Sequence, residues 1–223
     1  MMVSFDFLSK PIKLTCDKIS VLYIENQMLY RNTIANFYEG CLEENNIVFS
    51  ENFNPIKFKN NVCFVPNIFT VDFSSVFMKK MYEDLSNYAN TYLFEDTVKL
   101  KSNALTFLEN LSAGFDYDFE FKDDVDIIEF LKIQNFKPAL SKDNLLSTLL
   151  DFIILTKKYS PIKCFTILNL HNYFDSHELE LFYKELSYQH VRILLIENKK
   201  CFDTLPNEKI YIVDKDMCEI VEI

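Results

Sequence analysis

The run Ile19-Ser-Val-Leu-Tyr-Ile-Glu-Asn-Gln-Met28 decides the fold of this chain. Residues 19–24 predict a fully buried strand, and a helical pattern begins near Asn26. In a phosphate-binding α/β protein this junction carries a G-x-x-x-x-G-K-[ST] loop, whose glycines let backbone N–H groups cradle phosphate. Here the junction has no glycine, and the carboxylate of Glu25 stands where an anion would sit. The sequence therefore predicts an α/β scaffold without a phosphate loop and without a nucleotide ligand.

Strand patterns occur at both ends of the chain. Near the amino end, alternation or short apolar runs predict strands at residues 3–7, 11–14, 47–49 and 62–65. Near the carboxyl end, buried strands are predicted at residues 164–168, 191–196 and 209–213. Between the first two of these, Asp175 and Glu178 have the spacing of a capping box at the start of a helix. We expect this strand–helix–strand unit to be parallel, with a right-handed crossover.

The middle of the chain is helical. From Phe73, apolar residues recur at helical spacing as far as Tyr92, and further helices are predicted at residues 95–111, 124–134 and 144–159. The expected fold is α/β. A discontinuous α/β head, related to nucleotide-binding folds but lacking a phosphate loop, comprises residues 1–66 and 160–223. An extended helical leg, residues 67–159, is inserted into it.

Composition excludes several classes of protein. The formal net charge of −10 argues against a generally basic nucleic-acid binder, although a locally basic channel remains compatible with it. The apolar runs are much shorter than the roughly 20 residues that span a bilayer, and no signal-peptide pattern begins the sequence. None of the six cysteines forms a C-x-x-C pair, which favours reduced core cysteines. We expect a cytoplasmic protein without a membrane partner.

The densest charged segment is a candidate metal site. Calcium takes 6–8 oxygen ligands with tolerant geometry, but the segment lacks the spacing and the central glycine of an EF-hand. The alternative is a solvated acidic edge with carboxylates favoured at a helix start. The carboxylates are Asp116, Asp118, Glu120, Asp123, Asp124, Asp126 and Glu129.

Two further sets of residues are candidates for chemistry. His171 and Asp175 follow a buried strand, where open α/β sheets bind ligands, and with Asn169 they could form a hydrolytic site. A loop histidine and a helix cap explain the same residues without catalysis. Lys157 and Lys158 end the buried helix, so a rigid element fixes their position; the alternative is a solvated surface pair.

The order of these blocks resembles a known family. Residues 5–14 and 19–25 open the pattern, and Leu155-Thr-Lys-Lys158, residues 164–169 and residues 191–197 complete it. Together they are similar to the short form of the type II-A CRISPR-associated spacer-acquisition protein, an accessory subunit of adaptation. The resemblance spans nearly the whole chain and depends on the order of hydrophobic blocks.

The resemblance implies a function. Family members are homotetrameric rings that bind the ends of linear double-stranded DNA, are ordered by Ca²⁺ and have no established catalytic activity. It implies that Lys157 and Lys158 contact DNA and that the 116–129 carboxylates bind calcium. It also implies other CRISPR adaptation proteins and the effector nuclease as partners. Two alternatives remain: a divergent hydrolase that uses His171 and Asp175, and a purely structural oligomer whose acidic surface recruits basic partners.

Overall fold

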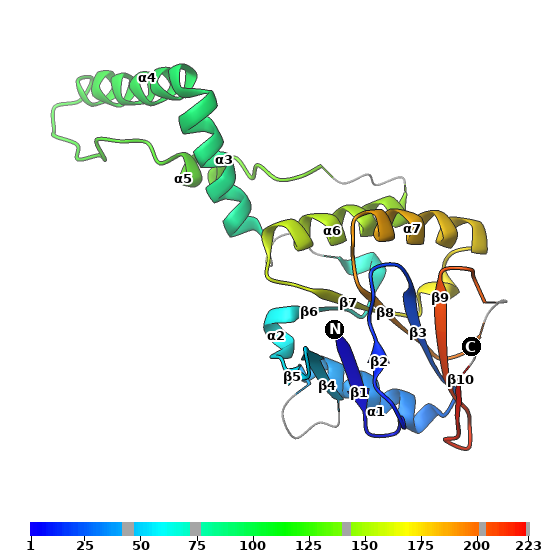
Figure 1. The fold of residues 1–223 in the computed structure, drawn as a ribbon. Coiled ribbons are helices and arrows are strands. Elements are labelled where there is room, and N and C mark those ends of the chain that lie inside the picture. The colour runs from blue at the N-terminus through cyan, green and yellow to red at the C-terminus, as the bar shows by residue number, and fades with distance from the viewer. Residues whose placement is uncertain (42–46, 72–76, 140–143, 201–203, 222–223) are drawn as a thin grey trace. The chain divides into compact units, whose positions relative to one another are not determined.

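The chain forms two compact units in a computed structural model that describes residues 1–41, 47–71, 77–139, 144–200 and 204–221 (Figure 1). The first unit, the head, comprises Met1–Asp72 and Ser141–Ile223. The second unit, the leg, comprises Phe73–Leu140. The head is mixed α/β and the described part of the leg is helical, so the predicted fold class is confirmed.

A six-stranded sheet forms the centre of the head. Its order is β10-β9-β3-β8-β7-β6, and all neighbouring strands are parallel except the antiparallel pair β9 and β10. Strands β3, β7 and β8 are buried along their whole length, as near-continuous apolar runs predict for a parallel sheet. The strands are β3 (Ile19–Ile24), β6 (Val62–Val65), β7 (Cys164–Leu168), β8 (Ile193–Glu197), β9 (Glu208–Val213) and β10 (Glu219–Val221).

A smaller antiparallel sheet of the head has the order β2-β1-β4-β5. Its strands are β1 (Met2–Phe5), β2 (Ile12–Lys13), β4 (Ile47–Glu51) and β5 (Asn54–Pro55). Val3 and Phe5 of β1 are buried, as their alternation with polar residues predicts.

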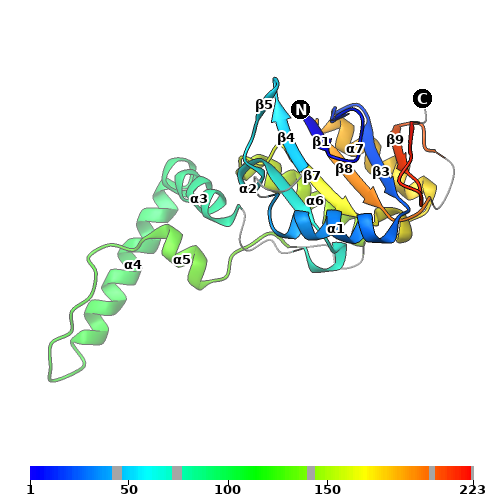
Figure 2. The same ribbon diagram turned by 90° about the horizontal axis from the view of Figure 1, so that it is seen from below.

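Helices cover both faces of the central sheet. α1 (Gln27–Tyr38) lies on one face, and α6 (Leu145–Tyr159) and α7 (Ser176–Tyr188) lie on the other (Figure 2). Alternate residues of the strands enter two separate cores. Leu22 of β3 and Leu194 of β8 pack in a cluster with Phe37 of α1. On the opposite face, the ring of Phe152 in α6 lies edge-on to Phe165 of β7, with centroids 6.4 Å apart.

Short helical elements complete the head. They are α2 (Phe58–Asn61) and the 3₁₀ turns η1 (Ile68–Thr70) and η2 (Leu170–Asn172). The predicted capping box is present: the Asp175 carboxylate accepts from Glu178 N–H at 2.9 Å, and the Glu178 carboxylate accepts from Asp175 N–H at 3.0 Å. The predicted parallel pairing of β7 and β8 around α7 is confirmed.

The leg contains α3 (Met78–Tyr92), α4 (Phe94–Ser112) and α5 (Ile127–Ile133). α3 contacts both α4 and α5, and the hydroxyl of Thr97 donates to the carbonyl of Ala89 at 2.9 Å. The expected start of the first helix at Phe73 lies outside the described residues. Many aromatic side chains of the leg stay exposed, because so small a unit cannot bury an apolar stripe on every helix face.

The boundaries of the units differ from the expected ones. The leg is shorter than residues 67–159 at both ends, because η1 and α6 belong to the head. α6 contacts η1 and α7 and buries Leu149, Phe152 and Ile153. Its apolar faces, which the sequence shows, therefore form part of the head core.

The structure bears on two expectations from the composition, one about membrane-spanning segments and one about the cysteines. Each helix within the described ranges is too short or too polar to cross a bilayer. The five described cysteines are free thiols. Burial raises the pKa of Cys63 and of Cys164 to about 12, which agrees with unreactive reduced thiols.

Candidate functional site

The start of α1, which follows β3, is capped by a side chain of the protein itself. Asn26 is the N-cap of α1, and its Oδ1 accepts a hydrogen bond from Leu29 N–H at 3.0 Å. Its Nδ2 donates to the carbonyl of Lys215 at 2.8 Å. A helix N-terminus binds phosphate through N–H groups that have no partner within the helix. Here Asn26 accepts from one of those groups, the N–H of Leu29.

A side-chain hydrogen bond also joins the carboxyl end of β7 to α1. Asn169 has a left-handed backbone (φ 51°) and directs the chain into η2. Its Oδ1 accepts from the hydroxyl of Tyr30 on α1 at 2.9 Å. Burial raises the pKa of Tyr30 to about 12, so this hydroxyl remains a donor. The Asn169 side chain thus links η2 to α1.

His171 lies in a buried polar network, which we call the histidine network and define as Tyr23, His171, Tyr183, Glu197 and Glu208. Its Nδ1 is 3.0 Å from the Tyr23 hydroxyl, and its Nε2 is 2.8 Å from the Tyr183 hydroxyl and 3.0 Å from a Glu208 oxygen. The Tyr183 hydroxyl donates to the same Glu208 oxygen at 2.9 Å. His171 is only 3% exposed. A general base must reach its substrate, so this imidazole is placed to hold the fold together.

Glu197 is the member of the histidine network that has, within the described ranges, a buried oxygen without a hydrogen bond. One oxygen accepts from the backbone N–H of His171 at 3.1 Å. The other oxygen is buried and receives no hydrogen bond from the described residues. Burial raises the pKa of Glu197 to about 7, because a desolvated carboxylate favours its neutral form. The network therefore contains a group that titrates near neutral pH.

Asp175 has a different role from His171. Asp175 is exposed and caps α7, whereas His171 is buried and hydrogen-bonded to two tyrosines. The predicted hydrolytic pair therefore consists of two residues with separate structural tasks. The geometry gives no support to the hydrolase alternative.

The two predicted DNA contacts have unlike surroundings. Lys157 donates from Nζ to the carbonyl oxygens of Gln189 and His190, the latter at 2.9 Å. These carbonyls end α7, where a cation is favoured by the helix macrodipole. Lys158 Nζ lies 4.8 Å from the centre of the Tyr159 ring. Both lysines are exposed, but Lys157 also holds the end of a helix.

The seven predicted calcium ligands are all exposed on the leg. Asp124 accepts from Lys101 Nζ at 2.9 and 3.1 Å, and Glu129 accepts from Lys122 Nζ at 3.0 Å. Asp126 caps α5 by accepting from Glu129 N–H at 3.0 Å. Within the described ranges, no three or more His, Cys, Asp or Glu side chains are grouped so that they could hold a metal ion. The carboxylates of a single chain therefore do not fit a calcium ion, which needs several oxygens around it.

The acidic segment before α5 is irregular chain. The rings of Phe115, Tyr117 and Phe119 pack against one another with centroids 5.2 to 5.7 Å apart. Exposed aromatic rings therefore accompany the carboxylates here.

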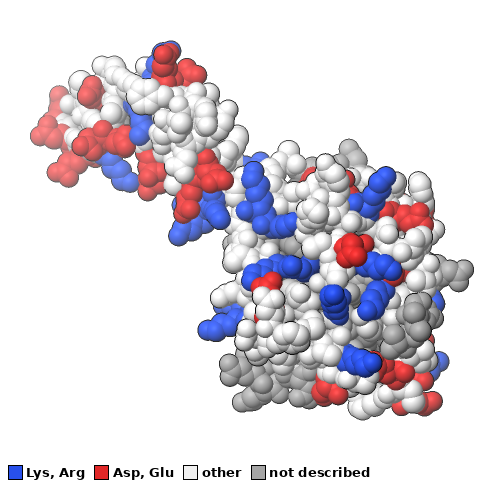
Figure 3. Space-filling model, viewed as in Figure 1, with Lys and Arg blue, Asp and Glu red and all other residues white. Residues whose placement is uncertain are grey.

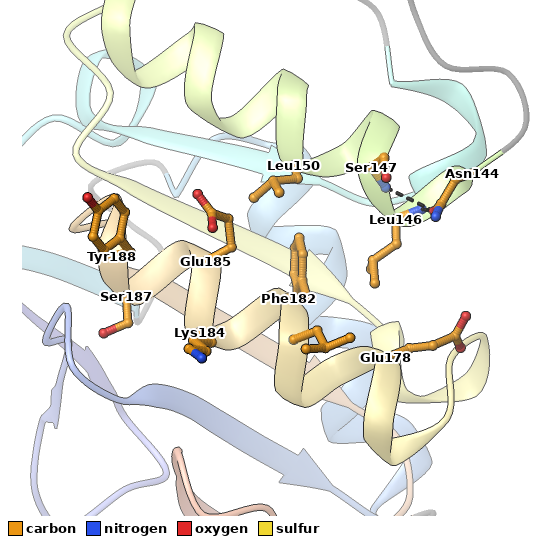
Figure 4. A pocket seen from close by; sticks show the side chains of 11 residues that line it. Asn144, Leu146, Ser147, Leu150, Glu178, Phe182, Lys184, Glu185, Ser187 and Tyr188 are labelled. Atoms are coloured by element: carbon orange, nitrogen blue, oxygen red, sulfur yellow. Dashed lines mark hydrogen bonds between the residues drawn. The ribbon is translucent and has the colours of Figure 1, made fainter.

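An open groove of about 860 Å³ lies between α6 and α7 (Figure 4). Leu146 and Leu150 line it from α6 and Phe182 lines it from α7. One of its polar residues, Asn144, accepts from the N–H groups of Leu146 and Ser147, so it serves as a helix cap. Leucine and phenylalanine side chains thus share the lining with polar ones, among them Glu178, Lys184 and Glu185.

The sequence analysis missed Tyr23, Tyr183, Glu197 and Glu208 as members of the histidine network. One signal was available for Glu197, since a carboxylate directly ends the apolar run of β8. Glu208 and Tyr183 give no such signal, because their partners are distant in sequence.

Comparisons with known proteins bear on the family. A model of the family described as CRISPR-associated protein (Cas_Csn2) matches residues 37–217, which confirms the resemblance indicated by the order of hydrophobic blocks. None of the curated proteins matches the chain. Among solved structures, it is similar to a Pyrococcus furiosus protein described as a putative ABC transporter (ATP-binding protein). The identity is 11%, the alignment covers 94% of this chain and 97% of that chain, and the TM-score is 0.41. So low a score carries no argument.

Glu197→Gln is expected to flatten the pH dependence of stability. Its folded-state pKa of about 7 lies above the usual value of 4.5, so the folded protein binds the extra proton between these values. The free energy of unfolding therefore falls as pH rises from about 4.5 to 7 in the wild type. The neutral amide lacks this contribution, and the two profiles should diverge by roughly 1–3 kcal/mol over that window. Denaturant titrations at several pH values measure it. Glu180→Gln, an exposed change on α7, should keep the wild-type profile.

Lys157→Gln is expected to lower the free energy of unfolding by about 1 kcal/mol, because the carbonyls at the end of α7 lose a cationic donor. Lys184→Gln, which removes an exposed lysine from the same helix, should change it by less than about 0.5 kcal/mol. Equal stabilities of the two variants in urea denaturation would remove Lys157 from the helix-capping role.

Proposed function

The chain belongs to the family of CRISPR-associated proteins described as Cas_Csn2, and we propose that it binds the ends of linear double-stranded DNA during CRISPR spacer acquisition. Binding is independent of sequence and involves no catalysis and no nucleotide. The binding form is a cytoplasmic homotetrameric ring that encircles the duplex. Its other partners are the remaining CRISPR adaptation proteins and the effector nuclease.

Lys and Arg side chains on one face of the head support the DNA-binding part of the proposal. The chain as a whole has a net charge of −10, yet many Lys and Arg side chains lie on the face of the head seen in Figure 3, with Asp and Glu side chains among them and along the edge. DNA binding depends on the local potential that a protein presents to phosphates. Groups of cations on an otherwise acidic protein suit contact with the DNA backbone at those places.

Two features of the carboxyl edge of the central sheet support a binding role without catalysis. Asn26 caps the helix at which a nucleotide phosphate would bind, and His171 is enclosed by the histidine network. This edge is where open α/β sheets normally hold their ligands. Since the histidine at this edge is buried, the charged outer surfaces of the head are the interaction sites in this proposal.

Exposed apolar side chains of the leg support self-association. Tyr92, Phe107 and Ile133 are 74%, 64% and 80% exposed. Exposed apolar clusters of this kind mark contact surfaces between proteins. Contacts between legs of different subunits would bury them.

Calcium is expected to bind the tetrameric ring and not the single chain. Asp124 and Glu129 are paired with lysines within one chain, and the described residues of that chain do not form a metal site. We propose that calcium binds where the acidic segments of neighbouring subunits approach one another. Clustered carboxylates repel, and a divalent ion replaces that repulsion by coordination.

Linear duplex DNA is expected to bind, and a covalently closed circle of the same sequence is not, because a ring that encircles DNA needs a free end. The measurement is a gel-shift titration of both forms at several salt concentrations. For linear DNA, log affinity should fall with log salt by about 0.9 per phosphate contacted. Equal affinity for the two forms would contradict the ring.

Lys158→Gln is the appropriate test of the predicted lysine contact. Removal of its charge should weaken linear DNA binding and reduce the salt slope, while the free energy of unfolding changes by less than about 1 kcal/mol. The same change at Lys157 confounds binding with stability, since Lys157 holds the end of α7. Undiminished DNA affinity of the Lys158 variant would exclude this residue from the interface.

Calcium is expected to raise the melting temperature and the tetramer fraction of the wild type. The stabilisation follows RT ln(1 + [L]/Kd), about 2.7 kcal/mol at a hundredfold excess over Kd. Magnesium should act weakly, because it requires strict octahedral geometry. The triple variant Asp123→Asn/Asp126→Asn/Glu129→Gln should lose the calcium response. It should keep the fold, since asparagine caps a helix as well as aspartate does. A calcium response that persists in the variant would locate the ion elsewhere.

A further inference from the structure

A basic pocket lies at the amino ends of β7 and β8, where Lys163 and Arg192 directly precede the two strands. Its volume is about 330 Å³. The lining residues are Cys16, Lys157, Ile162, Lys163, Phe165, His190, Val191 and Arg192. Three of them carry a positive charge at neutral pH, and none of these lining residues is acidic.

One carboxylate serves the cations of this pocket. Glu51, at the end of β4, accepts from Lys163 Nζ at 2.6 Å and lies 3.9 Å from an Arg192 nitrogen. The Lys163 hydrogen bond lowers the pKa of Glu51, and the positive charges of Arg192 and the amino terminus lower it further. Glu51 is therefore ionised at neutral pH. Glu51 thus contacts two of the three cations that line the pocket, Lys163 and Arg192.

Arg192 is the cation of the pocket with N–H donors available for a ligand. Its contact with Glu51 is too long for a hydrogen bond, and its side chain is 30% exposed. A guanidinium has five N–H donors in a fixed fork that matches a phosphate. Lys157 donates to two carbonyls and has three donors, so one donor remains for a ligand. Lys157 is held in place by these carbonyls before any ligand binds.

We propose that this pocket binds phosphate, and that in the DNA-bound protein the phosphate belongs to the DNA backbone. The second half rests on the proposed function. An anion here would be bound by the Arg192 fork and flanked by Lys157 and Lys163. The pocket is small enough to hold one phosphate group with its hydration. Glu51 sets the affinity, because it competes with the anion for Lys163 and Arg192.

Titration of inorganic phosphate at constant ionic strength tests the pocket itself. Wild type should bind phosphate with a saturating signal in calorimetry and in thermal shift, beyond that of chloride. Arg192→Gln should weaken this binding about tenfold or more, which is typical when a hydrogen bond to a charged group is removed. Arg31→Gln removes the other arginine of the chain, on α1, and should leave phosphate affinity unchanged.

Glu51→Gln gives a test that misfolding cannot imitate. Removal of the competing carboxylate should tighten phosphate binding by about threefold or more, because Lys163 and Arg192 then have no anionic partner other than the phosphate. Unchanged or weaker binding in this variant, in a protein with the wild-type circular dichroism spectrum, would overturn the role of Glu51. Absence of saturable phosphate binding in the wild type overturns the pocket.

Linear DNA binding distinguishes the source of the phosphate. Arg192→Gln should weaken DNA binding and reduce the salt slope by about 0.9 for each phosphate that the variant no longer neutralises, and Arg31→Gln should do so less. If the Arg192 variant binds DNA like the wild type but no longer binds inorganic phosphate, the pocket serves a free anion and the DNA assignment is wrong. If wild type binds phosphate but no DNA, the proposed function fails while the pocket stands.

Discussion

The histidine network is the constraint on which the head depends. An imidazole and two carboxylates are removed from water beneath α7, and each requires partners there, because an unpaired buried charge costs several kcal/mol. The partners come from β3, η2, α7, β8 and β9. Hydrogen bonds are directional, so the network fixes how α7 sits on the sheet more strictly than apolar contact does. Glu197 remains its weakest member and makes the stability of this region sensitive to pH.

Side chains at the carboxyl edge of the central sheet bear on where a ligand could bind. In an open parallel sheet the carboxyl ends of the strands form the usual ligand site. In this head, Asn26 occupies the start of α1, and Asn169 is held by Tyr30. His171 is turned inward. Cationic side chains are instead found at the opposite ends of β7 and β8, where Lys163 is exposed and Arg192 is partly exposed, which suits contact with phosphate.

Local patterns in the sequence predicted helices and strands. They did not predict side-chain contacts between residues that are distant in sequence. The strand at residues 19–24 and the capping box at Asp175 were predicted correctly because each depends on residues within one or two turns of itself. The contact of Tyr23 with His171 joins residues 148 apart in sequence, and no sequence pattern indicates it. Lys157 was singled out for its position at a helix end, but its role at the end of α7 depends on packing between two helices. The expected bounds of the leg differ from the observed ones for the same reason, since the sequence of an apolar helix does not show which unit the helix will pack against.

The scarcity of glycine limits the ways in which this fold could bind an anion. Only Gly40 and Gly114 are available, and Gly40 is used with φ 80° to end α1. Other left-handed positions are filled by residues with side chains, among them Asn169 and His190, at a steric cost that glycine avoids. A phosphate loop needs several glycines so that backbone N–H groups can approach the anion. Side-chain cations need none, because a long side chain reaches the phosphate from an ordinary backbone. On this glycine-poor scaffold the proposed recognition of phosphate therefore depends on lysine and arginine, which the residues before β7 and β8 provide.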